Sequence, residues 1–299
     1  MIFSILKSLE VSRGKLKKNI LLISIIIPTY NRKDSLSRSI KSVLDQTNED
    51  WELIIIDDGS RDGTGEGLEP YLVDERVKYY YQPHQGVAVA RNFGVEKSKG
   101  SYIVFLDSDD TFYPELIHFL QSCNISKYDL VCWEVLKIID GKEELWKPRK
   151  LSRFYNNIQA SFLAGSVGYK KSLFLKVGGY DPAMDFGENY ELGFRISREN
   201  KLKIKIINKP LLKYNVDTGS RTSNSLDNRL KSGLHQYAKH KKEYEKHPKE
   251  KAQMAYIIGH VFEKKGEKDA ALKYYKESWE SGKSKLKALV KTIYLTIIK

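Results

Sequence analysis

The sequence has few cysteines and no long apolar run. Its two cysteines, Cys123 and Cys132, provide neither a disulfide framework nor zinc-binding spacing, which fits a reducing compartment. The best apolar run, residues 20–27, is eight residues long and contains Ser24, whereas a membrane-spanning helix needs about 20 residues. The first residues carry their charges after a short apolar part, which is not the pattern of a signal peptide. We therefore expect a cytoplasmic protein.

Acidic residues are also in short supply. The chain holds 51 Lys and Arg against 38 Asp and Glu, a net charge of +13. Such a charge favours an anionic partner, which can be nucleic acid, an acidic membrane or a phosphorylated substrate. We expect no nucleic-acid partner, because the sequence contains no recognised nucleic-acid-binding motif. With 41% apolar and 11% aromatic residues, the chain can build a core, so disorder throughout is excluded.

Apolar stretches alternate with amphipathic ones over the first third of the chain. The continuous apolar stretches are typical of buried strands, which we expect at residues 19–28, 51–57 and 102–106, and a short further strand is expected at 76–82. The spacing of apolar residues between the strands predicts helices over 33–47 and 86–100. This alternation predicts an α/β fold with a mostly parallel sheet. Ligands of such sheets bind beyond the carboxyl ends of the strands.

Polar clusters follow three of these strands, at residues 28–31, 57–60 and 107–110. Packed carboxylates repel one another and are tolerated when they are exposed, protonated or bound to a cation. Asp107 and Asp109 at the end of one strand suit Mn²⁺ or Mg²⁺, which would share its shell with water and substrate phosphates. The alternative is a capped turn whose Asp side chains accept backbone N–H bonds. The matching acids at residues 57–58 favour the metal.

Four linked motifs resemble those of the family 2 glycosyltransferases with the GT-A fold: SIIIPTYNR, IIIDDGSRDGT, GVAVARNFGVEKSKGSYIVFLDSDD and GENYELGFRI. They cover about residues 23–200. The resemblance implies a Rossmann-like, mostly parallel sheet flanked by helices. It also implies transfer of a sugar from a nucleotide-sugar, usually UDP-linked, to an acceptor hydroxyl, with inversion at the anomeric carbon. Bacterial relatives of this kind often build cell-surface polysaccharide or lipid-linked glycan, so a glycan or a lipid-linked molecule is the expected acceptor.

The resemblance also implies roles for individual residues. Asp58 would accept a hydrogen bond from the uracil ring, with Asp57 as its alternative, and Arg91 would lie near the base or the diphosphate. Asp107 and Asp109 match the DxD motif, which meets ribose and metal, and Asp110 is a substitute for Asp109 in the metal shell. The remaining nucleotide-binding residues are expected to be Pro28, Thr29, Tyr30, Asn31 and Ser108.

Sugar transfer needs stabilisation of the leaving group, which the metal provides by taking up its charge. It also needs a carboxylate that accepts the proton of the acceptor hydroxyl. In the family this base lies in a Glu-Asp pair at a helix start, but here Asn189 follows Glu188 and cannot take a proton. Glu188 is the first candidate, and its alternative role is to stabilise a helix N-terminus. Glu191 is the second candidate, because Arg195 is positioned to hold it in an i,i+4 pair. Asn189→Asp is expected to preserve or raise activity.

The chain divides into an amphipathic segment (1–19), a glycosyltransferase domain (20–217) and a basic helical extension (225–299). Within the extension, residues 255–280 resemble one tetratricopeptide-type helix pair, which cannot bury its own face and should dock on the main domain or a partner. Both chain ends carry apolar residues at helical spacing with lysines. This pattern is typical of helices at an anionic membrane surface, here the inner face of the plasma membrane, and the alternative is packing on the globular domain.

Two other function classes stay open at this point. Residues 107–111, DSDDT, also fit the DxDxT motif of haloacid-dehalogenase-like phosphatases, in which the first Asp is a nucleophile. That interpretation leaves the PTYNR, DDGS and GENYEL motifs unexplained. A non-enzymatic basic scaffold would account for the charge, although no recognised nucleic-acid motif supports it. His84 precedes a predicted helix, and a lone histidine in a loop is typical of a surface residue rather than of a catalyst.

Overall fold

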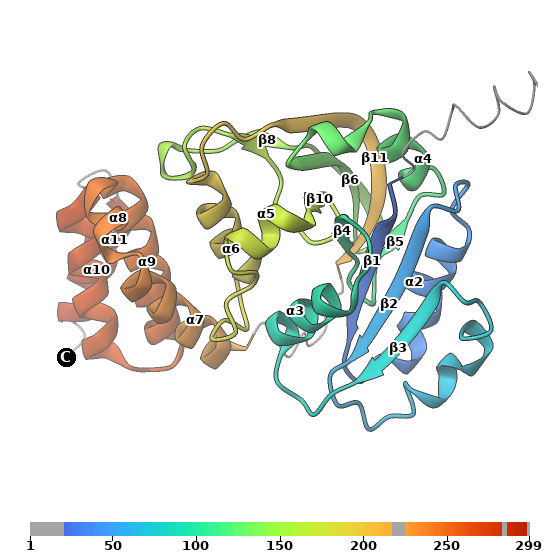
Figure 1. Ribbon diagram of the computed structural model, residues 1–299. Coiled ribbons are helices and arrows are strands. Elements are labelled where there is room, and N and C mark those ends of the chain that lie inside the picture. Colours follow the sequence, from blue (N-terminus) through green and yellow to red (C-terminus); the bar gives the residue numbers. More distant parts are fainter. Residues whose placement is uncertain (1–20, 217–224, 283–285, 298–299) are drawn as a thin grey trace, which may run out of the picture.

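The computed structural model describes residues 21–216, 225–282 and 286–297. The predicted amphipathic segment 1–19 lies outside the described residues. A sheet forms the centre of the molecule, with its first strands in the order β3, β2, β1, β4 (Figure 1). These strands are β1 (Ile23–Thr29), β2 (Trp51–Asp57), β3 (Val77–Tyr81) and β4 (Tyr102–Phe105).

The first half of the sheet is parallel, as the apolar runs predicted. β1 pairs in parallel with both β2 and β4, and β2 with β3. Thr29 at the end of β1 lies level with Asp57 at the end of β2. The polar clusters that follow the strands therefore meet at one edge of the sheet, beyond the carboxyl ends.

The second half of the sheet is mixed. β10 (Val167–Lys170) runs antiparallel between β4 and β6 (Leu130–Ile139), and the long β11 (Ile204–Val216) runs parallel to β6. β5 (Thr111–Phe112) pairs with β11, and β7 (Lys142–Trp146) pairs with β6. A separate two-stranded sheet joins β8 (Arg149–Lys150) to β9 (Gln159–Ala160). The antiparallel pairing of β5 with β11 places residues 109–110, which directly precede β5, beside the end of β11.

Helices cover both faces of the sheet, which is why β1 and β2 are buried along their whole length. α2 (Lys33–Leu44) and α4 (Leu116–Ser122) share one core with Ile25 and Ile27 of β1. The core on the other face contains Ile26 together with residues of α3 (Val87–Lys97), α5 (Lys171–Lys176) and α6 (Glu188–Ser197). α3 lies very close to the sheet, because a Cβ at Gly94 would come within 2.4 Å of the Ile26 side chain.

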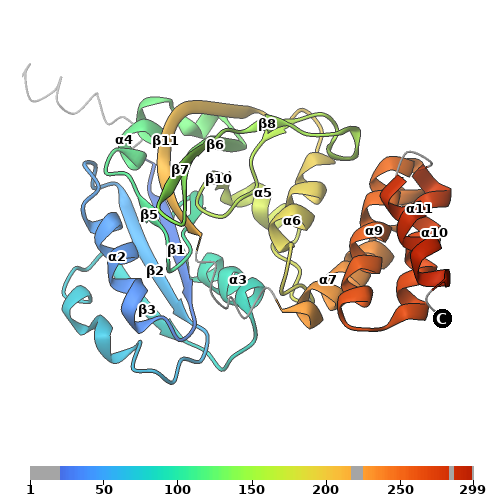
Figure 2. The same cartoon turned by 180° about the vertical axis from the view of Figure 1, so that it is seen from behind.

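Five helices follow the sheet and stand as a block beside α6 in both views (Figures 1 and 2). They are α7 (Leu226–Lys239), α8 (Lys241–Lys246), α9 (Pro248–Lys264), α10 (Lys268–Gly282) and α11 (Leu286–Ile297). α9 and α10 form the predicted helix pair, and Gly259 of α9 faces Ala271 and Tyr275 of α10. Within the described residues, no helix combines the length and the apolarity that crossing a bilayer requires.

The helical block is attached to the sheet domain by stacked aromatic rings. The ring of Phe154 lies 4.4 Å from that of Phe194 on α6 and 4.8 Å from that of Tyr244 on α8, measured between centroids. All three side chains are buried, and such pairs contribute about 0.5–1.5 kcal/mol beyond their buried area. The extension therefore packs on the main domain along α6, the helix that begins with Glu188.

Candidate active site

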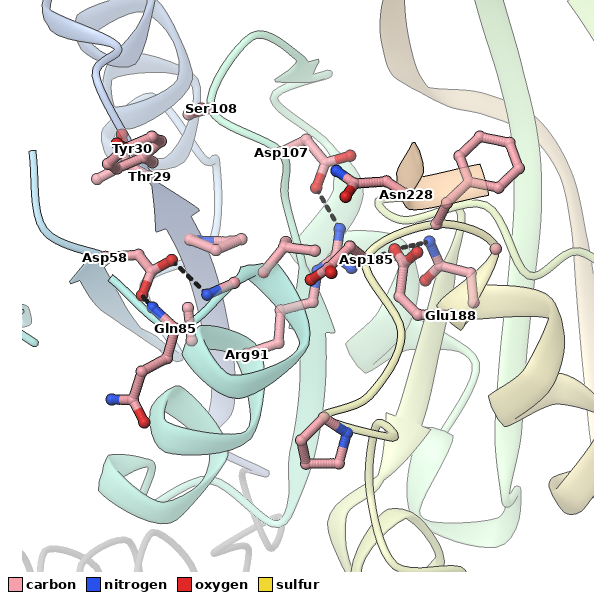
Figure 3. A pocket seen from close by; sticks show the side chains of 18 of the residues that line it. Thr29, Tyr30, Asp58, Gln85, Arg91, Asp107, Ser108, Asp185, Glu188 and Asn228 are labelled. Atoms are coloured by element: carbon pink, nitrogen blue, oxygen red, sulfur yellow. Dashed lines mark hydrogen bonds and ion pairs between the residues drawn. The ribbon is translucent and has the colours of Figure 1, made fainter. Parts of the chain in front are cut away.

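A cavity of 770 Å³ lies beyond the carboxyl ends of β1, β2 and β4 (Figure 3). Its opposite wall is formed by residues 185–190 and by Asn228 and Lys231 of α7. Nine of the predicted site residues line it: Pro28, Thr29, Tyr30, Asp58, Arg91, Asp107, Ser108, Asp109 and Glu188. Four predicted residues are not among the lining residues: Asn31, Asp57, Asp110 and Glu191.

Arg91 on α3 lies between two carboxylates at the centre of the cavity (Figure 3). Its Nη2 donates to Oδ1 of Asp107 at 2.7 Å, and its Nη1 donates to Oε1 of Glu188 at 2.7 Å. Burial by itself would lower the pKa of this guanidinium, but the two carboxylates outweigh burial and the pKa of Arg91 is raised. The side chain is therefore a permanent cation that joins the end of β4 to the start of α6.

Glu188 is the first residue of α6 and points into the cavity. Gly187 precedes it with φ +74°, a conformation that side-chain-bearing residues rarely adopt, and this sharp turn allows the helix to begin at the cavity wall. The amide of Asn189 donates from Nδ2 to the same Oε1 that Arg91 contacts, at 2.9 Å. Asn189 thus does not replace a missing acid; it contacts the acid that is present.

Asp58 is buried and its carboxylate accepts from three donors of one loop. Oδ1 accepts from Nε2 of Gln82 at 2.6 Å and from the backbone N–H of Gln85 at 2.9 Å. Oδ2 accepts from the backbone N–H of Gly86 at 2.8 Å and lies 2.8 Å from Nδ1 of His84. The carboxylate therefore shapes the loop that leads into α3. Acceptance of a uracil N–H by this carboxylate stays a prediction.

Tyr30 and His84 form a stacked pair on the side of the cavity where the strands end. Their ring centroids are 4.1 Å apart and their planes differ by 22°. Both residues line the cavity, and His84 is exposed there, as expected of a histidine in a loop. No local pattern brings the two together, because they are 54 positions apart and meet only when β1 and the loop after β3 reach the same edge of the sheet.

Asn31 and Asp57 shape the neighbouring loop instead of lining the cavity. The Asn31 side chain accepts from the backbone N–H of Arg61 at 2.8 Å. Asp57 is buried and accepts from the backbone N–H of Ser60 at 2.8 Å and from the hydroxyl of Tyr79 at 3.1 Å. Their expected direct roles in nucleotide binding are not supported, because both side chains are engaged in the turn that follows β2.

The acids after β4 point in different directions. Asp107 and Asp109 line the cavity, whereas Asp110 is fully buried and its Oδ1 accepts from the backbone N–H of Asn215 at 2.8 Å. The expectation that Asp110 can substitute for Asp109 in a metal shell is therefore not supported, because pairing with β11 holds Asp110 away from the cavity.

Asp107 and Asp109, the two acids after β4 that line the cavity, suit a metal ion that phosphates of the substrate would help to bind. Within the described ranges, no group of three or more His, Cys, Asp and Glu side chains is arranged to hold a metal. Mg²⁺ is commonly bound by one or two carboxylates together with substrate phosphates. Asp107 and Asp109 supply two carboxylates at the strand end where a diphosphate would lie, and one oxygen of Asp107 is already held by Arg91.

Glu191 lies on the side of α6 that meets the extension. It is fully buried, Arg195 contacts both of its oxygens, and its Oε1 lies 2.9 Å from Nζ of Lys239 and 2.9 Å from Nε2 of His240. Burial would raise the pKa of Glu191, but the hydrogen bonds from His240 and Arg195 lower it to about 2. Its expected role as the second candidate base is not supported, because it is outside the cavity and held by cations.

One helix of the extension also holds the loop that precedes Glu188. Nζ of Lys239 lies 2.6 Å from Asp181 as well as 2.9 Å from Glu191. The hydroxyl of Ser232 accepts from the backbone N–H groups of Asp185 and Phe186, each at 3.1 Å. α7 therefore contributes to the cavity wall and braces the turn that presents Glu188.

Apart from Glu188, the wall opposite Tyr30 and His84 consists of residues that were not predicted from the sequence. Its residues include Phe186 and Tyr190, whose rings are more than a third exposed, and Lys231, which pairs with Asp185 at 3.2 Å. For Phe186 and Tyr190 the sequence signal was the GENYEL motif, which Phe186 directly precedes and which contains Tyr190. Lys231 gave no signal, because only the packing of α7 brings it to the cavity.

A mostly parallel sheet with acids at its strand ends and a cavity beyond them is the arrangement in which α/β enzymes bind nucleotides. The chain matches the model of glycosyl transferase family 2 over residues 24–175, about half of its length, and it belongs to that family. The phosphatase and scaffold interpretations are thereby excluded as descriptions of this domain. The match ends before Glu188 and α7, so the second wall of the cavity lies outside it.

Similarity to individual curated proteins is high over short stretches of the chain. An uncharacterized glycosyltransferase of Rickettsia conorii is 48% identical over 95 residues, which are 32% of this chain and 16% of that protein. The putative teichuronic acid biosynthesis glycosyltransferase TuaG of Bacillus subtilis is 47% identical over 91 residues, 30% of this chain and 36% of that protein. The chain thus spans well under half the length of these curated relatives.

A solved structure shares the overall arrangement. TarS 1–349 of S. aureus in complex with UDP-GlcNAc superposes with a TM-score of 0.59 over 92% of this chain and 79% of that chain, at 15% identity. At this identity the likeness concerns the fold, which is the GT-A fold. The predicted α/β class with helical extension is thereby confirmed.

Replacing Glu191, the fully buried acid of α6, should lower the stability of the folded protein. We expect Glu191→Gln to lower the free energy of unfolding by about 3–5 kcal/mol, because it leaves Arg195, Lys239 and His240 without their buried counter-charge. Chemical denaturation at pH 7 measures this. The control is Glu199→Gln, which breaks an exposed pair with Lys176 and should cost about 0–1 kcal/mol.

The pH dependence follows from the lowered pKa. The stability that the Glu191 carboxylate contributes is complete above its ordinary pKa of 4.5 and disappears as the pH falls toward about 2. The difference between wild type and Glu191→Gln should therefore shrink across that window. A difference that stays constant from pH 7 to pH 3 would show that the charge of Glu191 does not hold the helices together.

Proposed function

We propose that the protein transfers a sugar from a UDP-linked donor to a hydroxyl of a glycan or lipid-linked acceptor, with inversion, in the synthesis of cell-surface polysaccharide. The observation that carries this proposal is the position of Arg91, which holds Asp107 and Glu188 at the same cavity. One carboxylate comes from the strand end where nucleotides bind, and the other comes from the helix opposite. A donor and an acceptor can therefore meet between them.

The donor would bind along the ends of β1, β2 and β4. The stacked rings of Tyr30 and His84 offer a flat surface to a nucleobase, with Pro28 and Thr29 beside them. The binding of UDP-GlcNAc by TarS and the name of TuaG support a UDP-sugar and a surface polymer for a chain of this family and fold. The donor sugar and the linkage are left open by these similarities.

Asp107 and Asp109 would hold Mn²⁺ or Mg²⁺ together with the diphosphate. When bound, such an ion neutralises the negative charge that develops on the leaving diphosphate. Arg91 supports this arrangement by fixing Oδ1 of Asp107, which leaves Oδ2 for the ion. Glu188 would take the proton of the acceptor hydroxyl as that oxygen attacks the anomeric carbon from the side opposite the diphosphate, which inverts the configuration.

The outer face of α11 supports an anionic membrane as a further partner. α11 packs on α10 through its buried residues Ala288 and Leu295, while five apolar residues on its other side are 49–74% exposed. These residues, which we call the α11 apolar face, are Leu286, Val290, Ile293, Tyr294 and Ile297. Apolar side chains on the solvent side of a helix mark an interaction surface.

The charge around this face favours lipid over a second copy of the chain. Residues 283–299 contain five lysines and no acid, and residues 225–299 carry 18 basic and nine acidic side chains, a net +9 of the total +13. A second copy on the same face would bring like charges together, whereas each lysine near an anionic bilayer contributes about 1 kcal/mol of attraction. We therefore propose docking at the inner face of the plasma membrane, which suits a lipid-linked acceptor.

The metal part of the proposal is tested at Asp109. We expect Asp109→Ala to abolish UDP release from a panel of UDP-sugars and to weaken UDP binding in calorimetry only when Mn²⁺ or Mg²⁺ is present, because several kcal/mol of charge stabilisation are lost. Asp110→Asn is the matched control and should keep metal-dependent binding, since Asp110 faces β11. Wild-type turnover that is unchanged by EDTA would contradict the metal role.

The base is tested at Glu188. Glu188→Gln keeps the shape of the side chain but cannot accept a proton, so we expect turnover to fall by about 10²- to 10⁴-fold while UDP and metal still bind. Glu191→Gln is the control for lost carboxylate on the same helix, compared at a temperature where it remains folded. If Glu188→Gln turns over at the wild-type rate, the base lies elsewhere.

The membrane partner is tested with vesicles. We expect the full chain to sediment with vesicles that contain an anionic phospholipid at low salt, and not with zwitterionic vesicles. The double variant Val290→Asn, Ile293→Asn should lose most of this binding, whereas Val73→Asn, which changes an apolar residue 83% exposed elsewhere, should keep it. Two results would contradict membrane docking. One is no binding to either kind of vesicle, and the other is a wild-type dimer in solution that is absent in the double variant.

A further inference from the structure

The two oxygens of the Glu188 carboxylate have different surroundings. Oε1 accepts two hydrogen bonds, from Arg91 Nη1 at 2.7 Å and from Asn189 Nδ2 at 2.9 Å. Across the described part of the chain, Oε2 makes no hydrogen bond. Two donors on one oxygen withdraw electron density from it, so the other oxygen is the better proton acceptor.

The donor from Asn189 is itself held in one orientation. Oδ1 of Asn189 lies 2.8 Å from the hydroxyl of Tyr180. An ionised carboxylate only accepts hydrogen bonds, so the amide nitrogen of Asn189 faces Glu188, its oxygen faces Tyr180, and the Tyr180 hydroxyl donates. The direction of each bond therefore follows from chemistry alone.

Tyr180 is a rigid end point for this series of bonds. Its ring is buried against Phe105 and Phe174, with centroids 5.2 Å and 5.6 Å away. Burial raises the pKa of Tyr180 well above its usual range, so the hydroxyl keeps its proton and remains a donor at any working pH. Its backbone is fixed as well, because Asn92 contacts both the N–H and the C=O of Tyr180.

We propose that Asn189 and Tyr180 are positioning residues that hold Glu188 by Oε1 and so make Oε2 the atom that takes the acceptor proton. This inference rests on the proposed glycosyl transfer. In the step, the acceptor O–H bond breaks and its proton goes to Oε2. The acceptor oxygen forms the bond to the anomeric carbon, and the sugar–phosphate bond breaks with its electron pair on the phosphate.

The positioning role accounts for an amide at position 189. An Asp there has no donor for Oε1 and places a second negative charge beside Glu188, which favours protonated Glu188. Under this proposal Asn189→Asp is expected to lower activity, in contrast to the sequence-based expectation that it preserves or raises activity. Arg91 still donates to the same oxygen in such a variant, so Oε1 of Glu188 loses one of its two hydrogen bonds.

The experiment compares Asn189→Asp, Asn189→Ala and Tyr180→Phe with wild type, using UDP release from the most active member of a UDP-sugar panel. We expect kcat to fall about 10- to 100-fold for both Asn189 variants and less for Tyr180→Phe, with the donor KM unchanged. For Asn189→Asp the acidic limb of the pH–rate profile should move up by about one pH unit or more. A purely structural role would not move that limb.

Two controls separate the causes. Asn200→Asp makes the same charge change at an exposed position just beyond the end of α6 and should leave rate and pH profile unaltered. A ¹³C NMR titration of the Glu188 carboxyl, assigned with Glu188→Gln, reads the effect without turnover. In Asn189→Asp this carboxyl should titrate at higher pH than in wild type.

The outcomes distinguish this inference from the proposed function. If Asn189→Asp keeps both its pH profile and the wild-type titration of Glu188 while Glu188→Gln is inactive, the positioning role is wrong and the base assignment stands. If Glu188→Gln is fully active, the proposed chemistry itself fails. If Asn189→Ala and Tyr180→Phe lose rate only in proportion to lost thermal stability, the contacts merely support the fold and the inference is overturned.

Discussion

A buried guanidinium with a carboxylate on each side is the interaction on which the site depends. Burying an isolated cation is very costly, and Arg91 is tolerated in the interior only because Asp107 and Glu188 neutralise it. The same pairing overcomes repulsion between the two acids, which come from the end of β4 and the start of α6. Arg91 thus connects the half of the molecule that carries the nucleotide motifs to the half that carries the candidate base.

α6 is held from two directions, and each direction uses a different acid. Glu188 points into the cavity and contacts Arg91, while Glu191 is buried against the extension and contacts Arg195, Lys239 and His240. The aromatic stack of Phe154, Phe194 and Tyr244 adds an apolar contact along the same helix. The extension is therefore part of the structure that presents Glu188, in addition to carrying most of the net positive charge.

The charge of the chain is unevenly distributed, and the structure shows where the excess can act. Residues 225–299 hold a net charge of +9, and the last helix exposes apolar side chains beside lysines. The cavity, in contrast, combines acids with a paired arginine and a paired lysine. The proposed attraction to an anionic surface and the proposed binding of a metal–diphosphate thus belong to different parts of the molecule.

The sequence by itself determined the class of fold and the edge of the sheet where the site lies. Runs such as residues 25–27 and 53–56 are apolar throughout, and a strand covered on both faces needs that composition. Parallel strands bring their carboxyl ends together, so the acids that follow them were certain to converge. The family motifs supplied the candidate residues, and nine of them do line the cavity.

Only the tertiary structure decided which of neighbouring acids faces the cavity. Asp109 and Asp110 are adjacent, yet pairing beside β11 buries Asp110 and leaves Asp109 at the cavity. Glu188 and Glu191 are one helical turn apart, and the packing of α7 decides that Glu191 is structural. His84 and Lys231 reach the cavity through contacts distant in sequence. The direction of a side chain depends on what packs against its element, and that information is absent from local spacing.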